Sequence, residues 1–443
     1  MYIIKGARII DPASKTDKIG DIYVDGTTIK DIVFDADKKV SDDADIIDAN
    51  GLIAMPGLID VHSHFRDPGF EYKEDILTGA KAAAAGGYTT VVLMCNTKPT
   101  VDNVETLKYV LDKGKKTDIK VESCGSVTYG LKGEKLTDFD ALTKAGAAGF
   151  TDDGIPLMNE DILREAFKKA GKYPVSLHEE DKNLIKNNGI NHGKASEHFG
   201  VYGSPREAEI NLIKRDLQIA LEENGMIDVQ HISTKEGVEL VKEALSKDIN
   251  IQRLNNIDEA NASESFVRHI HAEATPQHFS LTEDALISKG ILAKLNPPFR
   301  TEEDRQAIIE GLKNNTIDLI ATDHAPHAKE EKDKSITEAP SGMIGLETAF
   351  ALAITHLVNE AGMNLSDVIS KFTINPARLY NFDRGTLSVG KAADITLFNI
   401  NEKWIVKEEE IKSKSKNSPF IGEELTGRIK MTICDGRIVY RQE

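Results

Sequence analysis

The sequence has few cysteines and no long apolar run. Its three cysteines, Cys95, Cys124 and Cys434, are odd in number and far apart along the chain. They predict neither a disulfide framework nor a cysteine-rich zinc knuckle, so we expect a reducing, cytoplasmic location. No stretch of about 18 apolar residues occurs, and the N-terminus does not resemble a signal peptide. We therefore expect neither export nor a membrane span.

Positive charge is scarce relative to negative charge. The 443 residues contain 55 Lys and Arg against 72 Asp and Glu, which gives a formal net charge of −17. A surface that follows phosphates needs clustered positive charge, so we expect no nucleic-acid partner and no anionic membrane partner. With 40% apolar residues, a chain of this length can bury one large barrel or a few ordinary domains.

Both ends of the chain have the texture of short strands separated by turns. Residues 1–55 include "YIIKGARII" and "DIYVDGTTIKDIV", and residues 385–443 include "ADITLFNI" and "MTICDGRIVYRQ". From this shared texture we expect residues 1–55 and 385–443 to form one small β-sandwich-like domain.

Between these ends, apolar runs alternate with helical patterns. The eight runs are "GLIDVHSHF", "YTTVVLMCNT", "IKVESCGSV", "AAGFTDDG", "YPVSLHEE", "IDVQHIST", "HAEATPQHF" and "IDLIATDHAPH". Helical patterns with capping signals separate most of them, at 72–86, 159–170, 206–223 and 235–247. This alternation predicts an α/β fold, a (β/α)8 TIM-type barrel over residues 56–384. Residues 249–270 are polar and Asn-rich, and we expect a surface insertion there.

Histidines and aspartates lie where five of the expected strands end. They are His62, His64, Asp153, His178, His231 and Asp323. The carboxyl ends of the strands carry the chemistry of barrel enzymes. Because side chains alternate along a strand, His62 and His64 point to the same side and can reach one metal ion. Four imidazoles and two carboxylates suit a divalent ion such as Zn²⁺, and suffice for two ions that share a bridging carboxylate and a bridging water.

Such a metal pair predicts metal-assisted attack on an amide-like carbonyl, with Asp323 carrying the proton to or from the nitrogen. The alternative is that each histidine is a hydrogen-bonded core residue, which is the commoner role of a single buried histidine. Six such residues at the strand ends of one barrel favour the metal site.

Longer motifs surround these residues. They are "DVHSHFRDPG" from 60, "GGYTTVVLMCNTKPT" from 86, "AAGFTDDG" from 147, "HEED" from 178, "QHISTKEG" from 230, "LNPPFRTEEDRQAIIEGLKNNTIDLIATDHAPH" from 295, "APSGMIGLETAF" from 339 and "GKAADITLFN" from 390. Together they resemble the dihydroorotases of the longer bacterial class (type I), within the amidohydrolase superfamily. The resemblance covers nearly the full length.

The resemblance implies a zinc-dependent cyclic amide hydrolase. Its expected reaction is the reversible cyclisation of N-carbamoyl-L-aspartate to L-dihydroorotate in de novo pyrimidine (UMP) biosynthesis. A zinc-bound hydroxide would attack the ring amide carbonyl in the reverse direction, with Asp323 as the proton shuttle. The expected cofactor is Zn²⁺, either two ions per subunit or one in a single-metal state. The expected assembly is a homodimer.

Site roles follow from the same resemblance. His62 and His64 are expected to bind the more buried metal, and His178 and His231 the second. Asp153 would bridge the metals, and Asp323 would be both a ligand and the catalytic proton shuttle. The expected substrate-binding residues are His64, Arg66, Asn96, Asn296, His327, Ser341 and Gly342. Within this set, the forked cation of Arg66 suits the carboxylate of the substrate.

Three of these residues have plainer alternatives. Arg66 would form an ordinary salt bridge with Asp67 or Glu71, His327 would cap a loop, and Asn96 would end a strand in a turn. The chain also departs from the family in two places. Cys95 stands where the family usually has a proline, and Gln277 stands where a histidine is common.

Two other functions remain as alternatives. A hydantoinase or allantoinase shares the barrel and metals but generally bridges the metals with a carboxylated lysine, and "FTDDG" offers Asp153 and no lysine. A catalytically inactive dihydroorotase-like partner subunit should have lost metal ligands, and all six are present.

Overall fold

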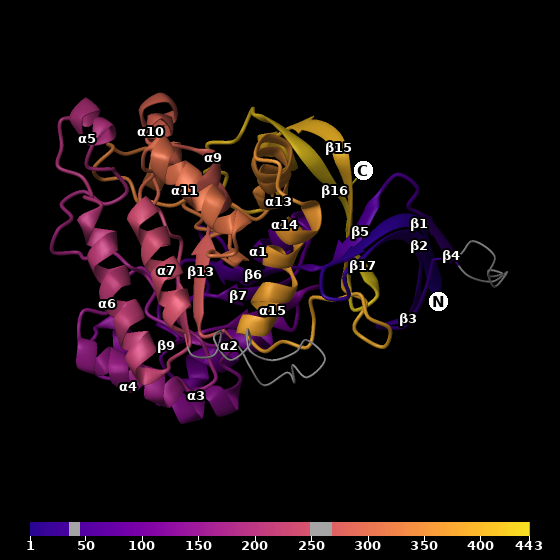
Figure 1. Cartoon of the computed structure of the whole chain (residues 1–443), viewed down its shortest axis with the longest axis horizontal. Helices are drawn as coiled ribbons and strands as arrows, with labels where there is room; N and C mark the ends of the chain where they lie inside the picture. The colour runs from indigo at the N-terminus through magenta and orange to yellow at the C-terminus, as the bar shows by residue number, and fades with distance from the viewer. Residues whose placement is uncertain (35–44, 249–267, 443) are drawn as a thin grey trace.

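The computed structural model describes residues 1–34, 45–248 and 268–442. Figure 1 shows a body of strands wrapped by helices, beside a sheet in which indigo strands from the N-terminus and yellow strands from the C-terminus lie together. The strands of the body are β6 (Leu58–Ser63), β7 (Tyr88–Leu93), β8 (Lys120–Ser123), β9 (Gly125–Ser126), β10 (Phe150–Thr151), β11 (Val175–Leu177), β12 (Ile227–Val229), β13 (Ile270–Ala274) and β14 (Leu319–Ile320).

These strands close into a barrel. They form one parallel group in the order β6-β7-β8 and another in the order β14-β13-β12-β11-β10-β9. The chain runs directly from β8 into β9, and a parallel bridge between Ser63 and His324 joins the end of β6 to the residues after β14. Every residue of β6 and β7 is buried, as expected for parallel strands covered on both faces. The predicted (β/α)8 barrel is confirmed.

Helices pack around the barrel because each carries an apolar stripe. In α4, the buried residues Leu163, Ala166, Phe167 and Ala170 recur at helical spacing, and the Asn159 side chain caps the N-terminus. The helices are α1 (Ile76–Ala85), α2 (Val104–Gly114), α3 (Phe139–Ala145), α4 (Glu160–Ala170), α5 (Lys194–Phe199), α6 (Glu207–Glu223), α7 (Lys235–Lys247), α9 (Pro276–Ser280), α10 (Asp284–Lys289), α11 (Glu302–Lys313), α12 (Lys329–Lys332), α13 (Ala349–Leu352), α14 (Leu365–Phe372) and α15 (Ile374–Leu379). Across the described ranges, none of the helices is both long and apolar enough to span a membrane.

Local capping explains where the elements differ from expectation. The helix predicted over 72–86 begins at Ile76, because the Asp75 side chain accepts hydrogen bonds from two backbone N–H groups of its first turn. The seventh run ends as a strand at Ala274, and Thr275 then caps α9. Of the expected insertion at 249–270, residues 249–267 lie outside the described residues.

The two ends of the chain build one eight-stranded sheet in the order β17-β16-β15-β5-β1-β2-β3, with β4 paired to β1. Its strands are β1 (Tyr2–Asp11), β2 (Thr16–Asp25), β3 (Thr28–Val33), β4 (Asp45–Asp48), β5 (Ile53–Pro56), β15 (Ile395–Ile405), β16 (Glu424–Cys434) and β17 (Arg437–Arg441). The join is the antiparallel pair β5–β15, in which Ile395 faces Pro56. The expected β domain of both termini is therefore present. Its description as sandwich-like and its boundaries at 55 and 385 stay predictions.

Candidate active site

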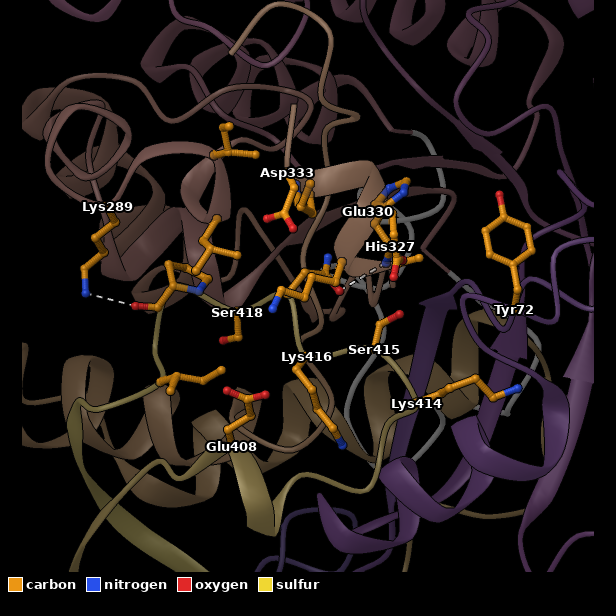
Figure 2. Close-up of a pocket in the computed structure, with 18 residues that line it drawn as sticks. Tyr72, Lys289, His327, Glu330, Asp333, Glu408, Lys414, Ser415, Lys416 and Ser418 are labelled. Carbon is orange, nitrogen blue, oxygen red and sulfur yellow. Dashed lines mark hydrogen bonds between the residues drawn. The ribbon is translucent and has the colours of Figure 1, made fainter. Parts of the chain in front are cut away.

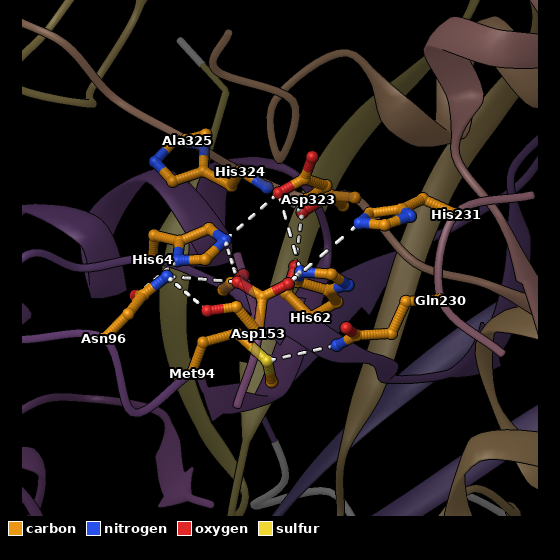
Figure 3. Close-up of polar contacts among 12 residues, drawn as sticks. His62, His64, Met94, Asn96, Asp153, Gln230, His231, Asp323, His324 and Ala325 are labelled. Carbon is orange, nitrogen blue, oxygen red and sulfur yellow. Dashed lines mark hydrogen bonds and ion pairs between the residues drawn. The ribbon is translucent and has the colours of Figure 1, made fainter. Parts of the chain in front are cut away.

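The six expected metal ligands lie inside a barrel strand or within three residues of its carboxyl end. His62 belongs to β6 and His64 follows it, His178 comes directly after β11, and Asp323 comes three residues after β14. All six side chains are buried. Because the strands are parallel, their carboxyl ends meet at one mouth of the barrel. Figure 3 shows the side chains of His62, His64, Asp153, His231 and Asp323 converging there.

The first part of the cluster surrounds the histidines of β6. Asp153 has one carboxylate oxygen 3.3 Å from His62 Nε2 and the other 3.4 Å from His64 Nε2. Asp323 Oδ1 lies 3.1 Å from His64 Nε2 and 3.6 Å from His62 Nε2. Figure 3 shows both carboxylates pointing into the space between the two imidazoles. This is the donor set of a cation site.

The second part shares Asp153. His178 Nδ1 lies 3.0 Å from His231 Nε2, and these two atoms lie 3.9 and 4.0 Å from Asp153 Oδ1. Two groups, His62–His64–Asp153 and Asp153–His178–His231, each offer three ligand atoms within 4.8 Å of one another. Asp153 thus occupies the bridging position between two potential cation sites.

The electrostatics of this cluster suit a divalent metal ion. Burial raises the pKa of Asp153. Positive charge on His62, the hydrogen bond between His62 and Asp153, and positive charge on His64 and His178 outweigh burial and hold that pKa well below its usual range. Burial and positive charge on His178 and His62 keep the pKa of His231 well below its usual value. Asp153 is therefore an ionised carboxylate and His231 a neutral imidazole. Burial lowers the pKa of His62 and of His178, but neighbouring carboxylates raise both above the usual value, so binding of a metal ion would displace protons there. In addition, His62 Nε2 is buried and faces the carboxylates of Asp153 and Asp323 at 3.3 and 3.6 Å, the side on which a cation would be bound.

The remaining nitrogen of each of three histidines is held by a neighbour. His62 Nδ1 lies 2.9 Å from Glu273 Oε2, and His64 Nδ1 lies 3.0 Å from Asn96 Oδ1. His178 Nε2 lies 3.3 Å from Glu180 Oε2. An acceptor at one ring nitrogen keeps the proton there and leaves the other nitrogen free for a metal. Glu273 and Asn96 are therefore placed to orient His62 and His64. His178 Nε2 also lies 3.1 Å from the Asn296 Nδ2 donor, so Glu180 is a charged neighbour of His178.

Sequence reasoning missed both glutamates. Glu273 is an acidic residue inside the buried strand β13, and Glu180 is the third residue of "HEED". A carboxylate inside a strand expected to be buried was a signal that could have marked Glu273, because a buried carboxylate needs a partner.

Backbone strain also gathers here. Arg66, His231 and Asp323 have φ values of 61°, 34° and 44°, in the left-handed region that residues with a Cβ seldom adopt. Each such residue costs about 1–3 kcal/mol and persists where the surroundings demand it, often at functional sites.

The expected substrate residues lie around this cluster. Arg66 donates from Nε to the Pro326 carbonyl oxygen at 3.2 Å, and its two terminal nitrogens make no hydrogen bond within the described ranges. Asp67, one of the two partners of the alternative salt bridge, pairs instead with Lys113 at 2.5 Å. Asn96 donates to Asp153 Oδ2 at 3.1 Å, so it contacts two of the metal-ligand residues besides ending a strand.

The far side of the site is formed by loops. His327 Nε2 lies 2.9 Å from the Ser341 carbonyl oxygen, and burial and the charge of Arg66 lower the pKa of His327 to about 2. The Ser341 hydroxyl and Asn296 Oδ1 are buried and have no hydrogen-bond partner among the residues that the structure describes. Gly342 has φ 122°, and a Cβ there would lie 2.8 Å from that of Ala325. These unpaired polar atoms and the bare backbone can receive a polar ligand.

Cys95 does not act as a ligand. Its thiol donates to the Thr151 carbonyl oxygen at 2.9 Å, and burial raises its pKa well above the usual value. Gln277 donates to the Thr322 carbonyl oxygen at 2.8 Å, next to Asp323. Both departures from the family therefore sit under the site as neutral hydrogen-bonding groups.

Comparison with known sequences decides the family. Residues 53–439 match the amidohydrolase family. The chain belongs to this family. This amidohydrolase is 49% identical over 445 residues to the dihydroorotase of Clostridium acetobutylicum, with 100% of both chains covered. It is 46% identical over 443 residues to the dihydroorotase of Clostridioides difficile, with 99% of this chain and 100% of that one covered. These relatives confirm the resemblance to dihydroorotases.

Solved structures agree on the fold. The amidohydrolase superposes on an L-hydantoinase (dihydropyrimidinase) from Arthrobacter aurescens with a TM-score of 0.85 at 25% identity, over 100% of this chain and 96% of that one. A D-hydantoinase from a Thermus species gives a TM-score of 0.81 at 20% identity, over 100% and 95% of the two chains. The second likeness is evidence of fold alone.

Proposed function

We propose that this amidohydrolase is a dihydroorotase that reversibly cyclises N-carbamoyl-L-aspartate to L-dihydroorotate in de novo pyrimidine biosynthesis. The observation that carries the proposal is the full-length identity of 49% and 46% to relatives of that name. The hydantoinase structures share 25% and 20% identity, so they leave the choice of substrate to the residues of the site.

We assign Zn²⁺ as the cofactor, with two ions per subunit. His62 and His64 would hold the first ion and His178 and His231 the second, with Asp153 between them and Asp323 beside the first. Bound zinc activates a water molecule and polarises the amide carbonyl. A single-metal state is the alternative, and metal analysis of the purified protein separates the two.

Arg66 and Asn96 would bind the carboxylate of the substrate. The terminal guanidinium nitrogens of Arg66 are available for two parallel hydrogen bonds to a carboxylate, which fixes the orientation of the ring. Asn296, Ser341 and Gly342 would meet the polar edge of the pyrimidine ring. His327 would do so as a neutral imidazole, because its pKa is lowered to about 2.

Asp323 would move the proton. Burial opposes its ionisation, but the hydrogen bond from His64 and the charge on His62 lower its pKa, so it begins as a carboxylate. In ring opening it would accept the proton released by the attacking water and pass it to the departing ring nitrogen. In cyclisation it would carry the proton the other way.

The direct test is turnover of L-dihydroorotate, with hydantoin and allantoin as parallel substrates, by protein whose zinc content is known. We expect activity on dihydroorotate, its loss on chelation and its return with zinc. A preference for hydantoin or allantoin would move the assignment to a sister enzyme. Zinc-loaded protein that turns over none of the three would favour a catalytically inactive partner subunit.

The location and assembly are part of the same proposal. All three cysteines are buried and free, which supports a reducing, cytoplasmic location. We assign a homodimer as the working form, and the mass of the protein in solution, measured by light scattering, tests this assignment.

A further inference from the structure

A segment of the β domain reaches across to the barrel. Residues 411–418, here called the strap, lie between β15 and β16, and Figure 2 shows Lys414, Ser415, Lys416 and Ser418 of this segment lining a pocket. The backbone N–H groups of Lys412 and Ser413 donate to the Glu347 carboxylate at 2.8–3.0 Å. The Lys414 N–H donates to Glu74 Oε2 at 3.1 Å. Two barrel carboxylates therefore hold the start of the strap.

The end of the strap contacts the substrate side of the site through a single amide. Asn417 Oδ1 accepts from the His327 backbone N–H at 3.1 Å. Its Nδ2 donates to the carbonyl oxygens of Ala325 and Gly342 at 3.2 and 3.1 Å. Its own carbonyl oxygen accepts from the Ile344 N–H at 3.1 Å. Asn417 is only 4% exposed, and both of its side-chain polar atoms are used.

These bonds join two separate loops. One loop carries His327 and the other carries Ser341 and Gly342, and both belong to the proposed substrate site. Beside them is a cavity of about 780 Å³, lined in part by His327, Asn417 and Lys416 (Figure 2). The two loops also meet directly, because the Ala325 N–H donates to the Met343 carbonyl oxygen at 2.9 Å and His327 Nε2 lies 2.9 Å from the Ser341 carbonyl oxygen. The side chain of Asn417 adds three hydrogen bonds to this contact.

We propose that Asn417 is a positioning residue, which clamps the His327 loop to the Gly342 loop so that both meet the substrate in one geometry. It acts through these loops and does not itself touch the reacting atoms. The inference rests on the proposed function, since the two loops are assigned to the pyrimidine ring there. It also gives the β domain a part in substrate binding.

The test compares Asn417→Ala with Asn375→Ala. Asn375 also donates to a carbonyl oxygen, that of Asp318 at 2.9 Å, but lies on α15 away from the strap. In zinc-loaded protein, Asn417→Ala should raise KM for dihydroorotate about tenfold while kcat falls much less, since the metal ligands are untouched. Asn375→Ala should leave KM within a factor of about two.

A second readout does not need activity. Amide hydrogen exchange of the peptide that contains His327 should become faster in Asn417→Ala, because the His327 N–H loses its acceptor. Asn417→Asp keeps that acceptor but turns an oxygen, in place of the amide donor, towards the carbonyl oxygens of Ala325 and Gly342. KM should rise in this variant as well, while His327 keeps more of its protection, which covers the case in which the alanine variant folds poorly.

The outcomes separate the two proposals. Unchanged KM and unchanged exchange in Asn417→Ala, with wild-type protein active on dihydroorotate, would overturn the clamp. An equal rise of KM in Asn375→Ala would also overturn it, because general loosening would then be enough. If the wild-type protein does not turn over dihydroorotate, the proposed function fails and exchange at His327 alone decides whether the clamp exists.

Discussion

The metal side and the substrate side of this site are held in different ways. The proposed metal ligands sit on strands or within three residues of a strand end, and Glu273, which lies 2.9 Å from His62 Nδ1, belongs to the barrel strand β13. On the substrate side, His327 and Gly342 sit on loops that are joined by Asn417 from the other domain. Strand register therefore determines the geometry of the metal side, whereas the substrate side depends on contacts between distant segments.

The largest effect should come from the metal side. Asp323→Asn keeps the size of the side chain but removes the proton acceptor, so kcat should fall about 10³-fold. Zinc content should stay close to that of the wild type, because the four histidines and Asp153 remain. Steady-state kinetics with metal analysis checks this, and near-normal kcat would remove Asp323 from the proton-transfer role.

On the substrate side, the next largest effect should be a weaker binding of dihydroorotate. Arg66→Met removes the cation proposed to hold the carboxylate, and KM for dihydroorotate should rise about 100-fold, which is the loss of one charged, two-pronged contact. Arg66→Lys, which keeps the charge without the fork, serves as the matched control and should recover part of the loss. An unchanged KM in Arg66→Met would assign carboxylate recognition to other residues.

A test of the metal side that spares every ligand is Glu273→Ala. Without an acceptor at Nδ1, His62 can turn or change its tautomer, and zinc affinity should fall by about 10- to 100-fold. Glu273→Gln still offers an oxygen to His62 and should lose less. Competition with a chelator measures both affinities, and wild-type affinity in Glu273→Ala would show that strand geometry alone positions His62.

The smallest effect concerns how the stability of the protein depends on pH through Glu347, the carboxylate that holds the start of the strap. The pKa of Glu347 is raised to about 7, because burial and the charge of Glu74 raise it. Hydrogen bonds from the strap and the charge of Lys416 lower it, but by less. Because the folded pKa lies above the unfolded value, folding takes up a proton here, and this contribution to stability is lost as pH rises through about 7.

The matching variant is Glu347→Gln, which cannot ionise. Between pH 5 and pH 8, the Tm of the wild type should fall relative to that of the variant, by about 2 °C or more. Thermal unfolding in matched buffers measures this difference. A constant difference across that range would show that Glu347 is not protonated in the folded protein.

The sequence predicts the metal side of the site better than the substrate side. Alternation of apolar and polar residues placed His62 and His64 on one side of a strand, and capping residues such as Asp75 shifted helix ends by only a few positions. The orienting role of Glu273 was out of reach, because its partner His62 lies 211 residues away in the chain. The contact between Asn417 and His327 was harder still to predict, because the two residues are 90 positions apart and nothing in the sequence around Asn417 marks it as a partner of His327.

The sequence by itself determined the barrel, the pairing of its two ends into one β domain and the set of metal-ligand types, because these depend on local periodicity and on side-chain chemistry. Only the tertiary structure decided which nitrogen of each histidine faces the shared carboxylates, which other carboxylate contacts His62, and that the strap contacts the two loops that carry His327 and Gly342. Those features arise from hydrogen bonds between residues far apart in sequence, and such bonds form only after the barrel has brought its strand ends and loops together.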